Sequence, residues 1–200
     1  MNRVGSYPWA DLWLAANLVT LGRIVASPLL FVLILSASES MGTSWAVLAV
    51  GWVLGASDYY DGWIARSSGS VSLWGAFLDP LADKVMILGA AWCFVAVGRF
   101  FWVPVLIITV RELLVSAVRT KWARDGLSLP ARRLAKFKTL VQGAALTVAA
   151  LPPLEGTGWA PSPAIWAAVA ITVYTGGRYL ADGRAGAIAA MGRGQSAGGV

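Results

Sequence analysis

Long apolar segments separated by short polar turns are the feature that most constrains how this chain can fold. A helix needs about 20 residues to cross the hydrocarbon core of a bilayer, and it satisfies its own backbone hydrogen-bonding groups there. Six segments are apolar and long enough to be read in this way: roughly 12–35, 43–65, 73–97, 101–120, 134–151 and 163–180. We therefore expect an all-α integral membrane protein, built as a bundle of six transmembrane helices.

The composition supports a membrane location. Hydrophobic residues make up 58% of the 200 residues and charged residues only 13%, whereas about a quarter of the residues in a soluble domain are charged. No change in composition divides the chain into two domains. We expect one transmembrane domain over residues 1–182, followed by a flexible cytoplasmic tail over residues 183–200, which is rich in Gly and Ala.

The basic residues are distributed unevenly between the two ends of the expected bundle. The first, third and fifth turns together contain one Arg and no Lys. The opposite end carries Arg3, Arg66, Arg119, Lys121, Arg124, Arg132, Arg133, Lys136, Lys138, Arg178, Arg184 and Arg193. Because basic residues are retained on the cytoplasmic side, we expect both termini to be cytoplasmic and the protein to lie in the cell's inner membrane.

The net charge and the missing residue types exclude several functions. The chain carries a formal charge of +6, but its basic residues lie between apolar segments, which favours anionic lipid and phosphate ligands over nucleic acid. It has no His, so an imidazole base and a Ser–His or Cys–His nucleophile pair are excluded. The lone cysteine, Cys93, cannot form a disulfide within the chain.

Four aspartates form the candidate catalytic centre. A charge inside an apolar segment is costly and indicates function. At about 100° per residue, Asp58 and Asp61 share one face of the second segment, and Asp79 and Asp83 share one face of the third. The short turn 67–72 would bring the two faces together, at the cytoplasmic end. Carboxylate oxygens favour Mg²⁺ or Mn²⁺, and two such ions bridged by carboxylates are suited to phosphoryl transfer.

Two other interpretations of the aspartates are possible. The carboxylates could form structural ion pairs with Arg66 and Lys84, although two cations cannot neutralise four acids. The protein could also be a membrane cation transporter, because carboxylates within membranes mark ion pathways. A transporter would distribute its acids through the depth of the membrane, whereas these four cluster at one edge.

The spacing of these aspartates belongs to a longer motif. The sequence Asp58-Tyr-Tyr-Asp61-Gly62-Trp-Ile-Ala65-Arg66, then eight residues, then Gly75-Ala-Phe-Leu-Asp79-Pro-Leu-Ala-Asp83 resembles the complete signature of the CDP-alcohol phosphotransferase family. The resemblance implies six transmembrane helices, usually in a homodimer, and dependence on a divalent metal ion.

The resemblance also implies a role for each position of the motif. Asp58, Asp61 and Asp79 would be metal ligands, and Asp83 would be a shared ligand or the general base. Gly62, Ala65 and Gly75 would leave room for the cytidine diphosphate, and Arg66 would lie near its phosphates or at the mouth of the site.

A second polar pattern lies in the first apolar segment. Asn17, Thr20 and Arg23 are spaced three residues apart and resemble an Asn-x-x-Thr-x-x-Arg pattern found near the nucleotide in the same family. We expect them to help bind CDP-diacylglycerol. The alternative is a polar network between helices, with Arg23 reaching toward the membrane surface.

The acceptor alcohol must be inferred from residues outside the motif. Arg111, Arg119, Lys136 and Lys138 are expected to converge on a phosphate group, although some of this charge could serve only to orient the chain. Together with the stretch around Asp79, they resemble the branch of the family that transfers a phosphatidyl group from CDP-diacylglycerol to glycerol 3-phosphate and releases CMP. Inositol phosphate, or phosphatidylglycerol in a cardiolipin-forming reaction, is the alternative acceptor.

Overall fold

The protein is entirely helical in the part of the chain that the computed structural model describes, which is residues 15–67, 73–124 and 133–197. Each of the six predicted apolar segments lies largely or wholly in one long helix. The helices are α1 (Ala15–Ser36), α2 (Trp45–Ser67), α3 (Leu73–Ala96), α4 (Trp102–Arg124), α5 (Arg133–Ala150) and α6 (Pro161–Ala197), with short 3₁₀ helices η2 (Ser38–Ser40) and η3 (Pro152–Leu154). The all-helical class expected from the sequence is confirmed.

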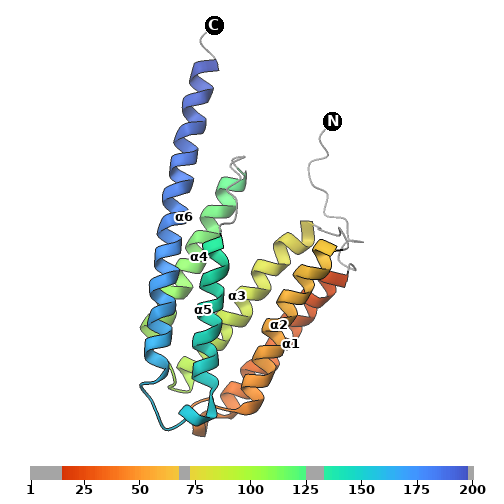
Figure 1. Cartoon of the computed structure of the whole chain (residues 1–200), viewed down its shortest axis with the longest axis vertical. Helices are drawn as coiled ribbons and strands as arrows, with labels where there is room; N and C mark the ends of the chain where they lie inside the picture. The colour runs from red at the N-terminus through yellow and green to blue at the C-terminus, as the bar shows by residue number, and fades with distance from the viewer. Residues whose placement is uncertain (1–14, 68–72, 125–132, 198–200) are drawn as a thin grey trace.

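The helices alternate in direction along the chain (Figure 1). Helix α1 packs against α2 and α3, and helix α6 packs against α4 and α5, so the molecule consists of two groups of three helices. Contacts of α3 with α4 and α5, and of α2 with α5, join the groups. The turns after α1, α3 and α5 lie at one end of the bundle, called here the turn end, and the beginning of α1 lies toward the other end.

The turn between α1 and α2 depends on a glycine. Gly42 has a φ of +80°, a backbone conformation that residues other than Gly rarely adopt. A Cβ atom at this position would also lie 2.9 Å from the ring of Phe94. The amide of Gly42 donates to the carbonyl of Ala37 at 2.8 Å and closes the end of α1.

The turn end is held together by a buried arginine. Arg99, which is only 3% exposed, follows α3 and donates to the carbonyls of Ala149 at 3.0 Å and Leu154 at 2.8 Å. Weaker contacts at 3.4 Å reach the carbonyls of Glu155 and Thr157. The guanidinium therefore binds a backbone carbonyl at the end of α5, where the last carbonyls of a helix have no intrahelical partner, and others in the turn that follows it.

Large apolar side chains lie both inside the bundle and on its outer surface. Ile34, Phe94 and Val105 are buried in the central core, whereas Val25 is 77% exposed and Trp159 is 72% exposed. By length and hydropathy alone, one helix in the described part of the chain, Asn17–Ser36, could cross a membrane, with a mean hydropathy of 2.3. The six-span topology therefore stays a prediction.

Helix α6 is longer than the predicted apolar segment 163–180. Its 37 residues correspond to about 55 Å at 1.5 Å per residue, against about 30 Å for the hydrocarbon core of a bilayer. In Figure 1 its final turns extend past the other helices. The predicted tail, which begins at residue 183, thus lies mostly within a helix that continues to Ala197, and its flexibility is untested.

Candidate active site

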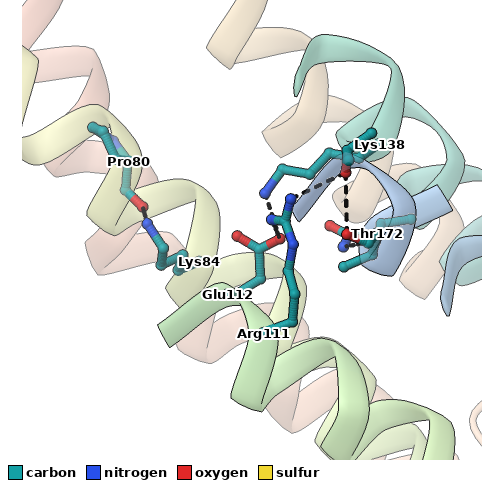
Figure 2. Close-up of polar contacts among 8 residues, drawn as sticks. Pro80, Lys84, Arg111, Glu112, Lys138 and Thr172 are labelled. Carbon is teal, nitrogen blue, oxygen red and sulfur yellow. Dashed lines mark hydrogen bonds and ion pairs between the residues drawn. The ribbon is translucent and has the colours of Figure 1, made fainter. Parts of the chain in front are cut away.

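Two of the four predicted metal ligands have described side chains, and both come from α3. Asp79 and Asp83 are one helical turn apart and therefore lie on the same face. The helix is continuous across Pro80, which interrupts its hydrogen-bonding pattern because proline has no amide hydrogen. Figure 2 shows the Lys84 ammonium donating to the Pro80 carbonyl at 3.3 Å. Among the described contacts, Lys84 therefore binds a carbonyl rather than one of the aspartates.

A residue from α1 contacts the first of these aspartates. The Thr20 hydroxyl donates to Oδ1 of Asp79 at 2.8 Å. Asn17, Thr20 and Arg23 are each no more than 2% exposed, so the three-residue spacing places all of them on the buried face of α1. The structure thus brings the predicted α1 pattern to the carboxylate site through Thr20. Binding of CDP-diacylglycerol by the three residues stays a prediction.

The other half of the motif lies on neighbouring helix ends. Asp58, Asp61, Gly62, Ala65 and Arg66 belong to the last turns of α2, and Gly75 belongs to the first turn of α3. Their side chains lie outside the described residues. Because only five residues separate α2 from α3 and both helices pack against α1, the backbone is compatible with the predicted convergence of four carboxylates. That convergence itself is untested.

A divalent cation fits the donor set that is described. Asp79 and Asp83 supply hard oxygen ligands one turn apart, and the hydrogen-bond donor on Asp79 is a neutral hydroxyl rather than a cation. Among the described side chains, no group of three or more potential metal ligands is found. This is expected, because Asp58 and Asp61 lie outside that set.

A cluster of largely buried charges lies between α4 and α5. We call Arg111, Glu112 and Lys138 the cationic cluster, since two of its three members are positive. Arg111 Nη1 lies 2.8 Å from Glu112 Oε1, and Lys138 Nζ pairs with the same oxygen (Figure 2). Lys138 is also close enough to Asp83 for an electrostatic interaction. Two of the four predicted acceptor-binding residues are thus brought together across α4 and α5.

The remaining two acceptor candidates are placed differently. Arg119 lies two turns beyond Arg111 on α4 and is exposed, and it has no recorded contact with the cationic cluster. Lys136 belongs to the first turn of α5, and its side chain lies outside the described residues. Their predicted role in binding the acceptor is untested.

Several residues that support the cationic cluster were missed by the sequence reading. Arg111 Nη2 donates to the Thr175 hydroxyl at 3.0 Å, and a Cβ atom at Gly176 would lie 2.5 Å from Arg111 Nε. Deeper in the bundle, Gln142 donates to the Thr172 hydroxyl at 2.9 Å. The sequence pattern that could have indicated them is a set of polar and small residues at positions 172, 175 and 176 of an apolar segment. This spacing places the three residues on one face of the helix.

These features define an all-helical bundle with an apolar outer surface, a carboxylate site suited to a cation and an adjacent pair of cations suited to an anion. The family comparison agrees with this class. The family model described as CDP-alcohol phosphatidyltransferase matches residues 13–174, and the chain belongs to that family. The resemblance inferred from the aspartate motif is confirmed.

Curated relatives point to one branch of the family. The chain is 35% identical over 171 residues to a "Probable phosphatidylglycerophosphate synthase" of Mycobacterium tuberculosis, covering 83% of this chain and 79% of that protein. It is 33% identical over 172 residues to a "CDP-diacylglycerol--glycerol-3-phosphate 3-phosphatidyltransferase" of Rickettsia typhi, covering 82% and 93%. A protein of the latter name from Haemophilus influenzae is 31% identical over 132 residues, covering 64% and 70%.

Proposed function

We propose that this protein transfers the phosphatidyl group from CDP-diacylglycerol to glycerol 3-phosphate, giving phosphatidylglycerol phosphate and CMP. The observation that carries the choice of acceptor is the position of Arg111 and Lys138, which meet at Glu112, with Lys138 within range of an electrostatic interaction with Asp83. Paired cations in a buried setting are suited to a phosphate group. The printed names of the relatives support the same acceptor.

The residues divide into three tasks in this proposal. Asn17, Thr20, Arg23, Gly62, Ala65, Arg66 and Gly75 accommodate CDP-diacylglycerol. Arg111 and Lys138, with Arg119 and Lys136 nearer the cytoplasm, hold the phosphate of the acceptor. Asp83 then accepts the proton of the primary hydroxyl as that oxygen attacks the phosphorus linked to diacylglycerol.

Metal binding belongs to the same proposal. Asp58, Asp61, Asp79 and Asp83 would hold Mg²⁺ or Mn²⁺, as two ions. When bound, the metal supplies positive charge that neutralises the pyrophosphate and stabilises the departing CMP. The support for this role is the hard oxygen donor set of α3 and the aspartate motif that the chain shares with its family.

The proposed orientation places the site at the cytoplasmic face of the inner membrane and the turn end at the opposite face. Exposed Trp45, Trp102 and Trp159 lie at or near the starts of α2, α4 and α6, all at the turn end, and tryptophan is enriched at membrane interfaces. The guanidinium of Arg99, the one basic group in these turns, is buried. Both features agree with six spans and cytoplasmic termini. The family resemblance adds a homodimer.

The alternatives to this function gain no support from the structure. Membership in a transferase family disfavours the cation transporter. Inositol phosphate and phosphatidylglycerol are the remaining acceptors within the family. No described contact favours either of them over glycerol 3-phosphate.

An acceptor screen tests the proposal. The purified protein is reconstituted with CDP-diacylglycerol and Mg²⁺, and CMP release is measured with glycerol 3-phosphate, inositol phosphate or phosphatidylglycerol. We expect release with glycerol 3-phosphate, a phosphatidylglycerol phosphate product, and loss of the reaction in excess EDTA. Asp79→Asn serves as the inactive control. Preferred use of another acceptor overturns the acceptor assignment, and full activity in EDTA overturns the metal assignment.

A further inference from the structure

We infer that Thr20 is a positioning residue for the metal site, which fixes the orientation of the Asp79 carboxylate through its hydroxyl. This inference rests on the metal-binding part of the proposed function and gives Thr20 a task distinct from binding CDP-diacylglycerol. The Thr20 hydroxyl holds the Asp79 carboxylate in place before any substrate binds.

The contact has the geometry of a strong hydrogen bond between two helices. The Thr20 hydroxyl and Asp79 Oδ1 are 2.8 Å apart, and a bond from a hydroxyl to an ionised carboxylate is stronger than one between neutral groups. Thr20 is 1% exposed, so bulk water cannot readily replace its hydroxyl. The two residues are 59 positions apart in the sequence, so the bond exists only in the folded bundle.

The bond leaves capacity for a cation on the same carboxylate. An ionised carboxylate has about four lone-pair sites, and Thr20 occupies one of them. Metal-binding side chains are commonly held by such outer hydrogen bonds, and loss of one typically weakens metal affinity about 10–100-fold. The cost arises because an unrestrained carboxylate must be ordered when the ion binds.

The packing of α1 against α3 makes this contact specific. Further along the same pair of helices, a Cβ atom at Gly89 would lie 2.2 Å from the ring of Phe31, so the two helices are closely packed there. Close packing fixes the distance between their backbones. Thr20 and Asp79 are therefore held at hydrogen-bonding distance by the rest of the interface rather than by their own bond alone.

Isosteric variants separate this role from a general effect on folding. Thr20→Val removes the hydroxyl while keeping the shape, and Thr20→Ser keeps the hydroxyl. Ser27→Ala is the matched control: Ser27 is also buried on α1, but its hydroxyl donates to the Arg23 carbonyl of its own helix at 2.8 Å. Each protein is titrated with Mn²⁺ alone, without lipid substrate, and free Mn²⁺ is followed by electron paramagnetic resonance.

We expect Thr20→Val to bind Mn²⁺ about 10–100-fold more weakly, Thr20→Ser to stay within a few-fold of the wild type, and Ser27→Ala to be unchanged. Mn²⁺ binding by Thr20→Val at wild-type affinity overturns the inference, as does an equal loss in Ser27→Ala or the absence of saturable Mn²⁺ binding in the wild type. If Thr20→Val weakens Mn²⁺ binding but the wild type does not use glycerol 3-phosphate, only the proposed acceptor fails.

Discussion

At the scale of single residues, the site depends on how charges are paired. Lys138 and Arg111 share one oxygen of Glu112, which keeps two like charges close together. Burial makes an unpaired charge costly, so Glu112 and the two cations that pair with it stabilise one another, whereas the two cations repel each other. The aspartates and the cations were predictable as residue types. The role of Glu112 as the common partner of Arg111 and Lys138 was not predictable, because it depends on how α4 and α5 are rotated toward each other.

Removal of Lys138 should weaken acceptor binding. In Lys138→Ala one charge-assisted contact to the phosphate is lost, which costs about 1.5–3 kcal/mol and raises the apparent KM for glycerol 3-phosphate roughly 10- to 150-fold. The KM for CDP-diacylglycerol should change little. Steady-state kinetics with each substrate varied in turn measure both values. Lys121→Ala removes an exposed lysine of α4 and is the control. An equal rise in both KM values would place Lys138 on the donor instead.

At the scale of elements, close helix contacts position the cationic cluster. Arg111 of α4 lies across Gly176 of α6, where any Cβ atom would meet its guanidinium. Nη2 of the same guanidinium donates to the Thr175 hydroxyl. The absence of a side chain at Gly176 thus leaves the space that the Arg111 side chain occupies. Helix periodicity gives the face of each helix but not its partner, so the sequence could not indicate this contact.

A matched pair of glycine variants tests the contact. Gly176→Ala would place a methyl group 2.5 Å from Arg111 Nε, whereas nothing lies within 4 Å of a Cβ atom at Gly177. We expect Gly176→Ala to displace Arg111 and raise the KM for glycerol 3-phosphate several-fold, with Gly177→Ala close to the wild type. Kinetics and thermal unfolding are measured for both variants. Equal KM values in Gly176→Ala and Gly177→Ala would show that acceptor binding does not depend on the position of Arg111.

Arg99 provides a second test at this scale. Its buried guanidinium donates to the Ala149 carbonyl at the end of α5 and to the Leu154 carbonyl in the following turn. Arg99→Ala removes both bonds, although the Leu154 carbonyl keeps those from the Thr157 amide and hydroxyl. We expect a loss of about 2–4 kcal/mol in unfolding free energy, seen as a lower melting temperature in detergent. The kinetic constants of the folded protein should be retained, because Arg99 lies at the turn end. Arg178→Ala, which removes an exposed arginine, should melt like the wild type.

At the scale of the whole molecule, the two ends of the bundle differ in charge. The turns at the turn end contain one basic residue, Arg99, which is buried, and the polar site residues lie toward the end opposite to it. This asymmetry predicts how the protein is inserted. Helices of alternating direction then place the beginning of α1 and the end of α6 on the side of the site (Figure 1).

Cysteine labelling tests the orientation. In a Cys93→Ala background, Glu39→Cys and Glu155→Cys place a thiol at exposed positions of the turn end, and Lys121→Cys places one near the opposite end. A membrane-impermeant maleimide added to intact cells should label the first two variants and leave the third unlabelled until the cells are lysed. Labelling of Lys121→Cys in intact cells would reverse the proposed topology.

The helical class and the family could be predicted from the sequence alone. They follow from the apolar segments and from a motif of fixed spacing, which are local or nearly local properties. The orientation in the membrane, inferred from the distribution of basic residues, stays a prediction. Asp79 and Asp83 were assigned correctly to one helix face for the same reason, because helix geometry relates residues four positions apart.

Which side chains meet between helices depends on how the helices pack. The bond from Thr20 to Asp79, the shared oxygen of Glu112, the passage of Arg111 over Gly176 and the carbonyl contacts of Arg99 all join residues that are distant in sequence. Each depends on the rotation and separation of packed helices. Those quantities are set by the fit of many side chains at once, and no short stretch of sequence contains them.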